Sequence, residues 1–206
     1  MRLRRYHLGA RWYDVLSAER WVYRLPRVRA IDRLGLEPGD LVLDVGCGTG
    51  LNLPLLRERV GAGGAVTGVD LSASMLVMAR RRIGRHGWHN VELIEGDAGD
   101  LDRLLGSRGP YDAVLFTYSL SVIDHWREAW SQAVGLLRPA GRVAVVDLAL
   151  PRGRWRVLAP VARIACWTGG VDPHRAPWRL AQGETVRPVH EILRGGHVHL
   201  VVGSAP

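Results

Sequence analysis

The segment that most constrains this chain runs from residue 41 to residue 50, where a short apolar run leads directly into a glycine cluster. Residues 41–45, Leu-Val-Leu-Asp-Val, indicate a buried strand. Gly46, Gly48 and Gly50 follow, and glycine lets the chain turn sharply and approach a ligand closely because it has no Cβ. A strand, tight turn and helix start of this kind is typical of an open α/β sheet with a ligand site at the carboxyl ends of its strands.

Apolar runs of strand length recur along the chain and alternate with stretches of helical period. After the first strand we expect strands at residues 65–69, 91–94, 113–116 and 142–148. We expect helices between them at residues 51–60, 73–83 and 125–137. Strands that alternate with helices form right-handed crossovers, so the sheet should be mostly parallel and covered on both faces.

The residues after the fifth strand predict one more helix and a pair of strands. Residues 157–167 form an apolar helical stretch, and residues 186–192 and 197–202 alternate around a tight turn at 194–196. This pair brings the sheet to seven strands, with at least one late strand antiparallel. The predicted fold class is a doubly wound, Rossmann-like α/β sheet with helices on both faces.

The 206 residues show no composition shift and no linker, so we expect a single domain. Its parts are an N-terminal helical lid (1–35), a cofactor-binding core (36–150) and a substrate-side helix with the final strand pair (151–206). Within the lid, two helices at residues 11–25 and 27–34 should be separated at Pro26, because proline interrupts a helix.

Cysteine usage and hydropathy restrict the cellular setting. Cys47 and Cys166 lie far apart without a third partner, so we expect neither a disulfide framework nor a metal site. The sequence contains no apolar run of about 18 residues and no signal-type start. We therefore expect a cytoplasmic protein.

The net charge of +8 is unevenly distributed, and all 28 basic residues are arginine. Residues 1–33 hold nine Arg against three acids, residues 34–150 eleven against fourteen, and residues 151–206 eight against three. The positive charge therefore lies on both flanks. It indicates either an anionic partner (a membrane surface, a phosphorylated or carboxylate substrate, or RNA) or plain solubility charge.

Three acidic residues lie at successive predicted strand ends beside the glycine loop. Asp44 precedes the loop, Asp70 ends the second strand twenty residues after Gly50, and Asp97 follows the third strand. A carboxylate at Asp70 could accept both hydroxyls of a ribose, and one at Asp97 could accept an adenine amino group. Each acid alone is typical of a turn or helix cap, but together they indicate one nucleotide site at one sheet edge.

With these residues in place, the sequence resembles the class I S-adenosylmethionine-dependent methyltransferases over residues 36–150. The motifs are D-V-G-C-G-T-G (44–50), V-D (69–70), G-D-A (96–98), Y-D-A-V (111–114) and L-L-R-P-A-G-R (136–142). The resemblance implies S-adenosyl-L-methionine as cofactor. It also implies that the residues binding it are Asp44, Gly46, Cys47, Gly48, Gly50, Asp70, Leu71, Met75, Asp97, Ala98, Tyr118 and Ser119. Leu71 and Met75 would flank the adenine, and Tyr118 and Ser119 would face the sulfonium end.

Methyl transfer requires alignment of nucleophile, methyl and sulfur, and no metal. A general base would help a phenol or an enolisable carbon, and the candidates are Tyr13, Asp14, His125 and His174, of which Tyr13 and His125 are preferred. For His125, however, a solvent-exposed position beside a helix cap is the favoured interpretation. His197 and His199 would share one strand face, but without a carboxylate partner a metal pair is disfavoured.

Two further resemblances concern the acceptor. Residues 11–17 are similar to the opening of the lid in lipid and quinone methyltransferases, and residues 165–170 with Pro177-Trp178 are loosely similar to bacterial phospholipid N-methyltransferases. Several of the eight tryptophans stand beside arginine, which suits a membrane interface as well as an ordinary core.

The sequence therefore favours methylation of a small amphipathic acceptor, with a phosphatidylethanolamine-like lipid amine first. C- or O-methylation of a quinone or another small metabolite is the alternative. Two alternatives from other functional classes stay open: a cofactor-binding protein without catalytic activity, and an NAD(P)-linked oxidoreductase. We expect peripheral contact with an anionic membrane and no nucleic-acid substrate, because no recognition module is appended; the sequence leaves the oligomeric state open.

Overall fold

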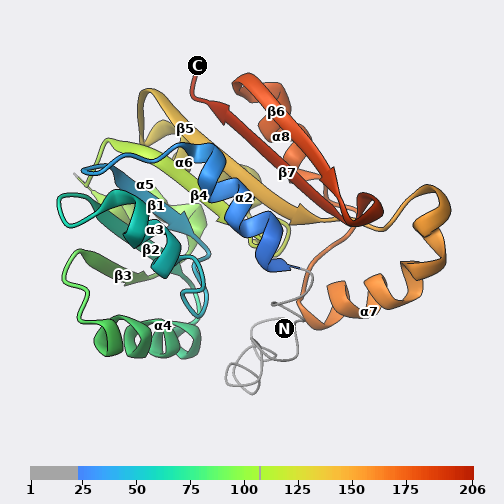
Figure 1. Ribbon diagram of the computed structural model, residues 1–206, viewed down its shortest axis with the longest axis horizontal. Helices are drawn as coiled ribbons and strands as arrows, with labels where there is room; N and C mark the ends of the chain where they lie inside the picture. Colours follow the sequence, from blue (N-terminus) through green and yellow to red (C-terminus); the bar gives the residue numbers. More distant parts are fainter. Residues whose placement is uncertain (1–22, 107) are drawn as a thin grey trace.

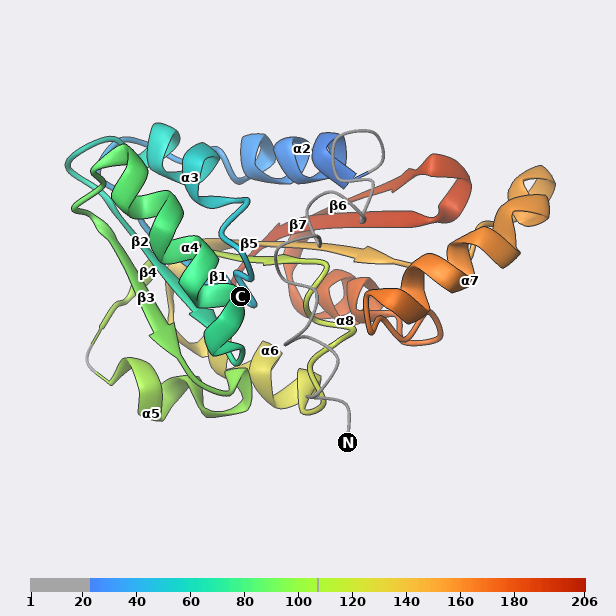
Figure 2. The same cartoon turned by 90° about the horizontal axis from the view of Figure 1, so that it is seen from below.

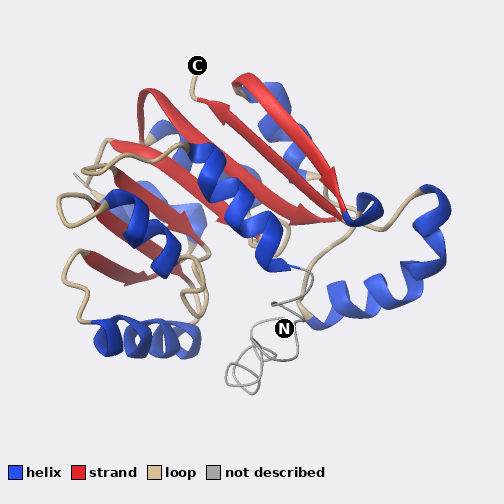
Figure 3. Ribbon diagram, viewed as in Figure 1, coloured by secondary structure: helices blue, strands red, loops and turns tan. Residues whose placement is uncertain are grey.

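The computed structural model of the protein describes residues 23–106 and 108–206. Seven strands form one sheet in the order β3-β2-β1-β4-β5-β7-β6 (Figure 3). The strands are β1 (Leu41–Val45), β2 (Ala65–Asp70), β3 (Val91–Glu95), β4 (Tyr111–Thr117), β5 (Leu137–Leu148), β6 (Val186–Leu193) and β7 (Val198–Ser204). Strands β1 to β5 pair in parallel, and β7 pairs antiparallel with both β5 and β6. The predicted fold class is confirmed.

Helices cover both faces of this sheet (Figure 2). They are α2 (Arg24–Leu34), α3 (Leu53–Val60), α4 (Ala73–His86), α5 (Leu101–Leu105), α6 (Trp126–Gly135), α7 (Ala159–Thr168) and α8 (Pro177–Glu184). Three 3-10 helices join them: η3 (Ala98–Asp100), η4 (Gly153–Leu158) and η5 (Arg194–Gly196). None of the helices among the described residues is long and apolar enough to cross a membrane.

Each face of the sheet has its own hydrophobic core. On one face, Ile31 of α2 and Leu53 and Leu56 of α3 are fully buried against β1 and β4. On the other, Trp130 of α6 packs on Phe116 of β4, and α5 and α8 complete the layer. Because β1 and β4 are buried on both faces, their side chains are apolar almost throughout, as expected for central parallel strands.

The prediction of a helix break at Pro26 is wrong. Helix α2 begins at Arg24, so Pro26 occupies its first turn, where a missing backbone N–H removes no intrahelical hydrogen bond. The helix packs on β5 and β7, and Ala30, Ile31 and Leu34 are buried there. This part of the predicted lid therefore belongs to the packed core. Residues 1–22, which carry the rest of the predicted lid, lie outside the described residues.

Helix α7 stands apart from the two layers. It follows β5 and η4 and projects away from the body at one end of the molecule (Figure 1). Its predicted span, residues 157–167, is close to the observed one, although the first two residues belong to η4. The helix returns through residues 169–176 to α8, which the sequence did not predict.

Candidate functional site

The glycine loop follows β1, and its three glycines at alternate positions, Gly46, Gly48 and Gly50, all have left-handed backbone angles. The φ angles of Gly46 and Gly48 are 71° and 54°, values that residues with a Cβ rarely adopt. The backbone N–H groups of Gly46 and Cys47 both donate to the carbonyl of Val69 (2.8 and 3.0 Å), which fixes the loop beside the end of β2. Cys47 itself is buried, and burial raises the pKa of its thiol.

Two of these glycines serve different purposes. A Cβ at Gly46 would collide with the Cβ of Ser119, so the absence of a side chain there permits close packing of two loops. A Cβ at Gly48 would meet no atom of the described residues within 4 Å. Within the described part of the chain, the loop therefore leaves open space at Gly48.

Asp70 joins β2 to the glycine loop. Its Oδ2 accepts a hydrogen bond from the backbone N–H of Gly48 and its Oδ1 from that of Ser72, each at 2.8 Å. Burial raises the pKa of this carboxyl against the lowering effect of those two bonds. Each carboxylate oxygen has a second acceptor site, so Asp70 can still accept a pair of hydroxyl groups.

The next strand end supplies Asp97 and Ala98. Asp97 caps η3, since its Oδ1 accepts from the N–H of Gly99 at 2.8 Å, and Ala98 is buried beside it. Between this loop and the glycine loop, Leu71 is 49% exposed while Met75 on α4 is buried. An exposed leucine next to Asp70 gives the edge an apolar surface suited to a flat ring.

Behind the glycine loop lies a buried polar cluster that sequence reasoning missed except for Asp44. The side-chain amide of Asn52 donates to Asp44 Oδ1 (2.8 Å) and to Thr117 Oγ1 (2.9 Å). The guanidinium of Arg27, from α2, donates to Asn52 Oδ1 (2.6 Å) and to Thr117 (3.2 Å). The position of Asn52 just after the loop is a signal that could have found it. Arg27 gives no such signal, because it reads as an ordinary charge on an amphipathic helix.

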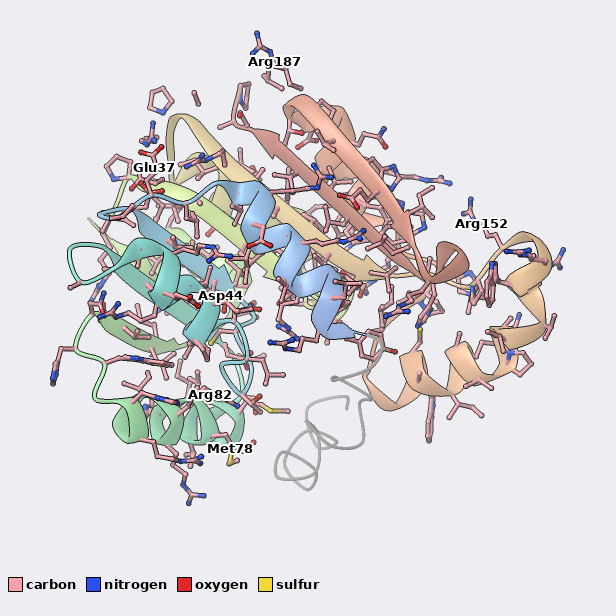
Figure 4. The ribbon with its side chains drawn as sticks, viewed as in Figure 1. Glu37, Asp44, Met78, Arg82, Arg152 and Arg187 are labelled. Atoms are coloured by element: carbon pink, nitrogen blue, oxygen red, sulfur yellow. The ribbon has the colours of Figure 1, made fainter. Side chains whose placement is uncertain are left out.

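Asp44 is the unusual member of this cluster (Figure 4). The carboxyl is fully buried, and burial raises its pKa to about 7, although its hydrogen bond with Asn52 and the charge of Arg27 oppose the shift. Its Oδ2 has no hydrogen-bond partner among residues 23–106 and 108–206. An unsatisfied buried oxygen directly before a ligand-type loop points to a donor supplied by a ligand.

Tyr118 and Ser119 lie where β4 ends. Tyr118 has a φ of 57°, an uncommon value for a non-glycine residue and one associated with functional sites. Its hydroxyl donates to the carbonyl of Tyr23 (2.9 Å), its ring meets that of Tyr23 edge to face, and the Arg27 guanidinium lies 5.5 Å from its ring centre. Ser119 donates to the carbonyl of Val45 at 2.7 Å and is buried. The predicted pair therefore borders the glycine loop directly.

The candidate general bases are dispersed. Tyr13 and Asp14 lie outside the described residues. His125 is exposed at the start of α6, and a Cβ added at Gly99 would lie 3.4 Å from its Cβ, so it stands beside the Asp97 loop. His174 lies elsewhere, in the segment between α7 and α8.

The expectation that His197 and His199 share a face is wrong. His197 ends η5 with helical backbone angles, so β7 begins only at Val198 and the alternation starts there. His197 meets Tyr23 and the carbonyl of Ala149 on one side. His199 stacks on Trp178 on the other, with ring centres 4.1 Å apart. Burial, with nearby charges, lowers the pKa of His199 to about 4.

A cavity of about 460 Å³ lies beyond the end of β5. Four arginines and one histidine line it, namely Arg152, Arg156, Arg175, Arg179 and His174, and its lining among the described residues includes no acidic side chain. Arg175 connects it to the loop after β4, donating to the carbonyls of Ser121 (3.3 Å) and Ile123 (2.6 Å).

The same loop is anchored by Asp147, a fully buried residue near the end of β5. Its carboxylate accepts hydrogen bonds from the N–H and hydroxyl of Ser121 at 2.8 and 2.6 Å. Burial raises the pKa of Asp147 to about 6, and these bonds and Arg175 oppose the shift.

These features fit S-adenosylmethionine. The open space at Gly48 can take its ribose and methionine portion, Asp70 retains acceptor sites for its ribose hydroxyls, and the unpartnered Asp44 Oδ2 lies directly before the loop. Leu71, Met75, Asp97 and Ala98, which follow the ends of β2 and β3, could receive its adenine.

Comparison with known proteins gives the same assignment. A methyltransferase domain family matches residues 42–141. The demethylmenaquinone methyltransferase of Listeria welshimeri is 31% identical over 125 residues, covering 61% of this chain and 52% of that protein. The chloroplast 2-phytyl-1,4-beta-naphthoquinone methyltransferase of Arabidopsis thaliana is 36% identical over 138 residues, covering 65% and 51%. The chain thus spans about half the length of the curated relatives it matches.

Among solved structures, the phosphoethanolamine N-methyltransferase 2 of Haemonchus contortus, in complex with S-adenosylhomocysteine, superposes with a TM-score of 0.70 at 15% identity. The match covers 87% of this chain and 52% of that one, and shows a shared fold. The loop geometry and the match over residues 42–141 together place this chain among the class I S-adenosylmethionine-dependent methyltransferases.

Proposed function

We propose that the protein methylates a quinone-type ring, at carbon or oxygen, with S-adenosylmethionine as the methyl donor. The observation that carries the proposal is the identity of 31% over 125 residues and 36% over 138 residues to two quinone methyltransferases. The lipid-amine reading, preferred from the sequence, has weaker support, because the phosphoethanolamine enzyme is only 15% identical and shares the fold alone.

In this proposal the chain binds and orients two molecules at one sheet edge. Bound S-adenosylmethionine supplies a methyl group already activated on a sulfonium sulfur. Asp70 accepts the ribose hydroxyls, the open face of Gly48 receives the nucleoside, and Asp97 and Ala98 bind the adenine edge. Holding the methyl in line with the acceptor and excluding water lowers the activation barrier. For well-oriented reactants this effect can supply roughly 7 to 11 kcal/mol.

The loop after β4 would position the acceptor. Tyr118 and Ser119 start this loop beside Gly46, while Asp147 and Arg175 fix its middle. A quinol ring loses a proton when its carbon is methylated, so a base within reach would help. His125, exposed beside the Asp97 loop, and Tyr13 stay the candidates for that base.

A parallel methyl-transfer assay tests the proposal. Purified protein would be incubated with tritium-labelled S-adenosylmethionine and, in separate reactions, a demethylated naphthoquinol, a benzoquinol precursor, and phosphatidylethanolamine vesicles. We expect label in a quinol and none in phosphatidylethanolamine. With the Asp70→Ala variant we expect no label in any of the reactions. Label recovered only in monomethyl-phosphatidylethanolamine would refute the quinone assignment and favour the lipid amine.

A further inference from the structure

The projecting segment formed by η4 and α7, residues 153–168 and here called the arm, has an unusual distribution of side chains. Toward the body it presents small residues, Ala162 and Cys166, which are 6% and 1% exposed. Toward solvent it presents larger apolar residues instead of the polar ones expected on a surface helix. They are Trp155, Val157, Leu158, Val161, Ile164 and Trp167.

These six residues form the apolar face of the arm. Val161, Ile164 and Trp167 of α7 are 67%, 63% and 62% exposed, and their spacing places them on one side of the helix. Val157 of η4, just before the helix, is 77% exposed. Isolated exposed apolar residues are ordinary, but a contiguous set on one projecting helix marks an interaction surface. Two of the six are tryptophans, whose rings favour the boundary between water and lipid.

The charge around this face indicates what covers it. Residues 148–171 contain four arginines, Arg152, Arg154, Arg156 and Arg163, and no acidic residue. The guanidinium of Arg154 lies 5.4 Å from the ring centre of Trp155, so cation and apolar group are presented together. An apolar helix face with arginine beside it is the pattern that binds anionic membrane surfaces.

The arginine-lined cavity adjoins the same surface. Arg152 lies just before the arm and Arg156 within it, and both line the cavity with Arg175 and Arg179. Burial is the main cause of the lowered pKa of His199, and the charges of His190, Arg152 and Arg179 add to it. A concave site of several arginines suits a phosphate group such as that of an anionic lipid.

We propose that the arm is a membrane-docking element that inserts its apolar face into the headgroup region of an anionic bilayer, with lipid phosphates held by the arginines at its base. This deepens the proposed function by naming where the acceptor is met, since hydrophobic quinones dissolve in membranes. Only that consequence rests on the proposed function. Docking itself rests on the arm and is measured without any acceptor.

Vesicle co-sedimentation of the full chain tests the proposal. We expect binding to phosphatidylcholine mixed with phosphatidylglycerol, much weaker binding to phosphatidylcholine alone, and release by added salt because surface attraction is screened. The double variant Ile164→Glu, Trp167→Glu should lower the partition coefficient by about tenfold or more. Its matched control is Val186→Glu, Val189→Glu, which adds the same charge at two exposed apolar positions on β6 and should retain most of the binding.

Two further variants separate the contributions. Ile164→Ser, Trp167→Ser removes apolar surface without charge and should weaken binding to both vesicle types. Arg154→Gln, Arg156→Gln should reduce the preference for the anionic vesicles by at least about fivefold. Affinity for S-adenosylhomocysteine, measured by calorimetry, should stay unchanged in all of them and so reports that each variant is folded.

Several results would overturn the proposal. One is equal binding by the arm variants and the β6 control, and another is no binding of wild type to anionic vesicles at low salt. A third is loss of binding on Arg2, Arg4, Arg5→Glu while the arm variants bind normally, which would assign docking to the N-terminal segment. A fourth is a wild-type dimer in sedimentation that the arm variants dissociate, which would make a second copy the occupant.

Discussion

The glycine loop and the arm present opposite solutions to molecular recognition. In the loop, recognition is built from the main chain: left-handed glycines, N–H groups fixed on Val69 and Asp70, and a close contact between Gly46 and Ser119. In the arm, the main chain forms an ordinary helix and the outward side chains provide the surface. A site of the first kind should tolerate few substitutions, whereas a surface of the second kind should tolerate many until its partner is present.

Within the loop, the largest effect should come from adding one methyl group at Gly46. Gly46→Ala should lower the free energy of unfolding by about 3 kcal/mol, since its Cβ collides with Ser119 and its φ is 71°. Gly48→Ala should cost only about 1 kcal/mol, the backbone term alone. Urea unfolding compares the two.

The same position tests cofactor binding. Calorimetry should show that the folded Gly48→Ala and Gly48→Val variants lose affinity for S-adenosylhomocysteine. Normal binding by either variant would show that the open face at Gly48 does not bind the cofactor.

The buried carboxyl behind the loop should produce a pH dependence of stability. Because the pKa of Asp44 is raised from 3.8 to about 7, the folded protein retains a proton that the unfolded chain releases between these values. The contribution of Asp44 to the free energy of unfolding should therefore fall as pH rises through this window, by about 1 kcal/mol per pH unit, and level off above it. His199, whose pKa is lowered from 6.5 to about 4, contributes a slope of the opposite sign between these values, so the quantity to measure is the difference in slope between wild type and Asp44→Asn. Asp44→Asn should remove that part of the slope, while a smaller part from Asp147, with its pKa of about 6, remains. Identical slopes in wild type and variant would contradict the assignment.

Asp70→Asn tests the loop on its ligand side. We expect affinity for S-adenosylhomocysteine to fall by about 1 to 2 kcal/mol, because one of the two acceptor oxygens for the ribose hydroxyls is replaced by a donor. Asp102→Asn, an exposed acid on α5, is the control and should bind normally. Calorimetry with both variants decides, and equal affinities would remove Asp70 from the cofactor site.

The smallest effect should be on the stability of the arm. Ile164→Ala should change the free energy of unfolding by less than about 0.5 kcal/mol, as expected at a 63% exposed position. Ile31→Ala, the same substitution at a 1% exposed position on α2, should cost about 2 to 5 kcal/mol. A large cost at Ile164 would mean that the arm packs against the protein itself. The arm would then be part of the folded core and not a surface for a partner.

The sequence was most informative where one signal decided the structure. Strands β1 and β4 are largely apolar runs that the parallel sheet buries on both faces, and the glycine spacing located the loop. Helix α8 was missed because eight residues containing Gly183 give a weak helical period. The beginning of β5 was missed because Arg138-Pro139-Ala140-Gly141 reads as a turn.

The buried cluster shows a different limit. Asp44 could be singled out by its place beside the loop, but its partners depend on tertiary packing. Arg27 reaches Asn52 only because α2 crosses the sheet next to α3, and Thr117 joins them from β4. Similarly, His197 and His199 lie on different sides because His197, directly after η5, has helical backbone angles, which an alternation pattern in the sequence does not reveal.

The position of β7 between β5 and β6 has a consequence for synthesis. β6 is translated before β7, yet it can join the sheet only through β7. While these residues are being made, β5 presents an unpaired edge, and unpaired edges attract other chains. We expect the nascent sheet to be sensitive to anything that delays translation after β5. The hairpin then closes the sheet in one step, so a ribosome stalled between β6 and β7 would release a chain prone to aggregation.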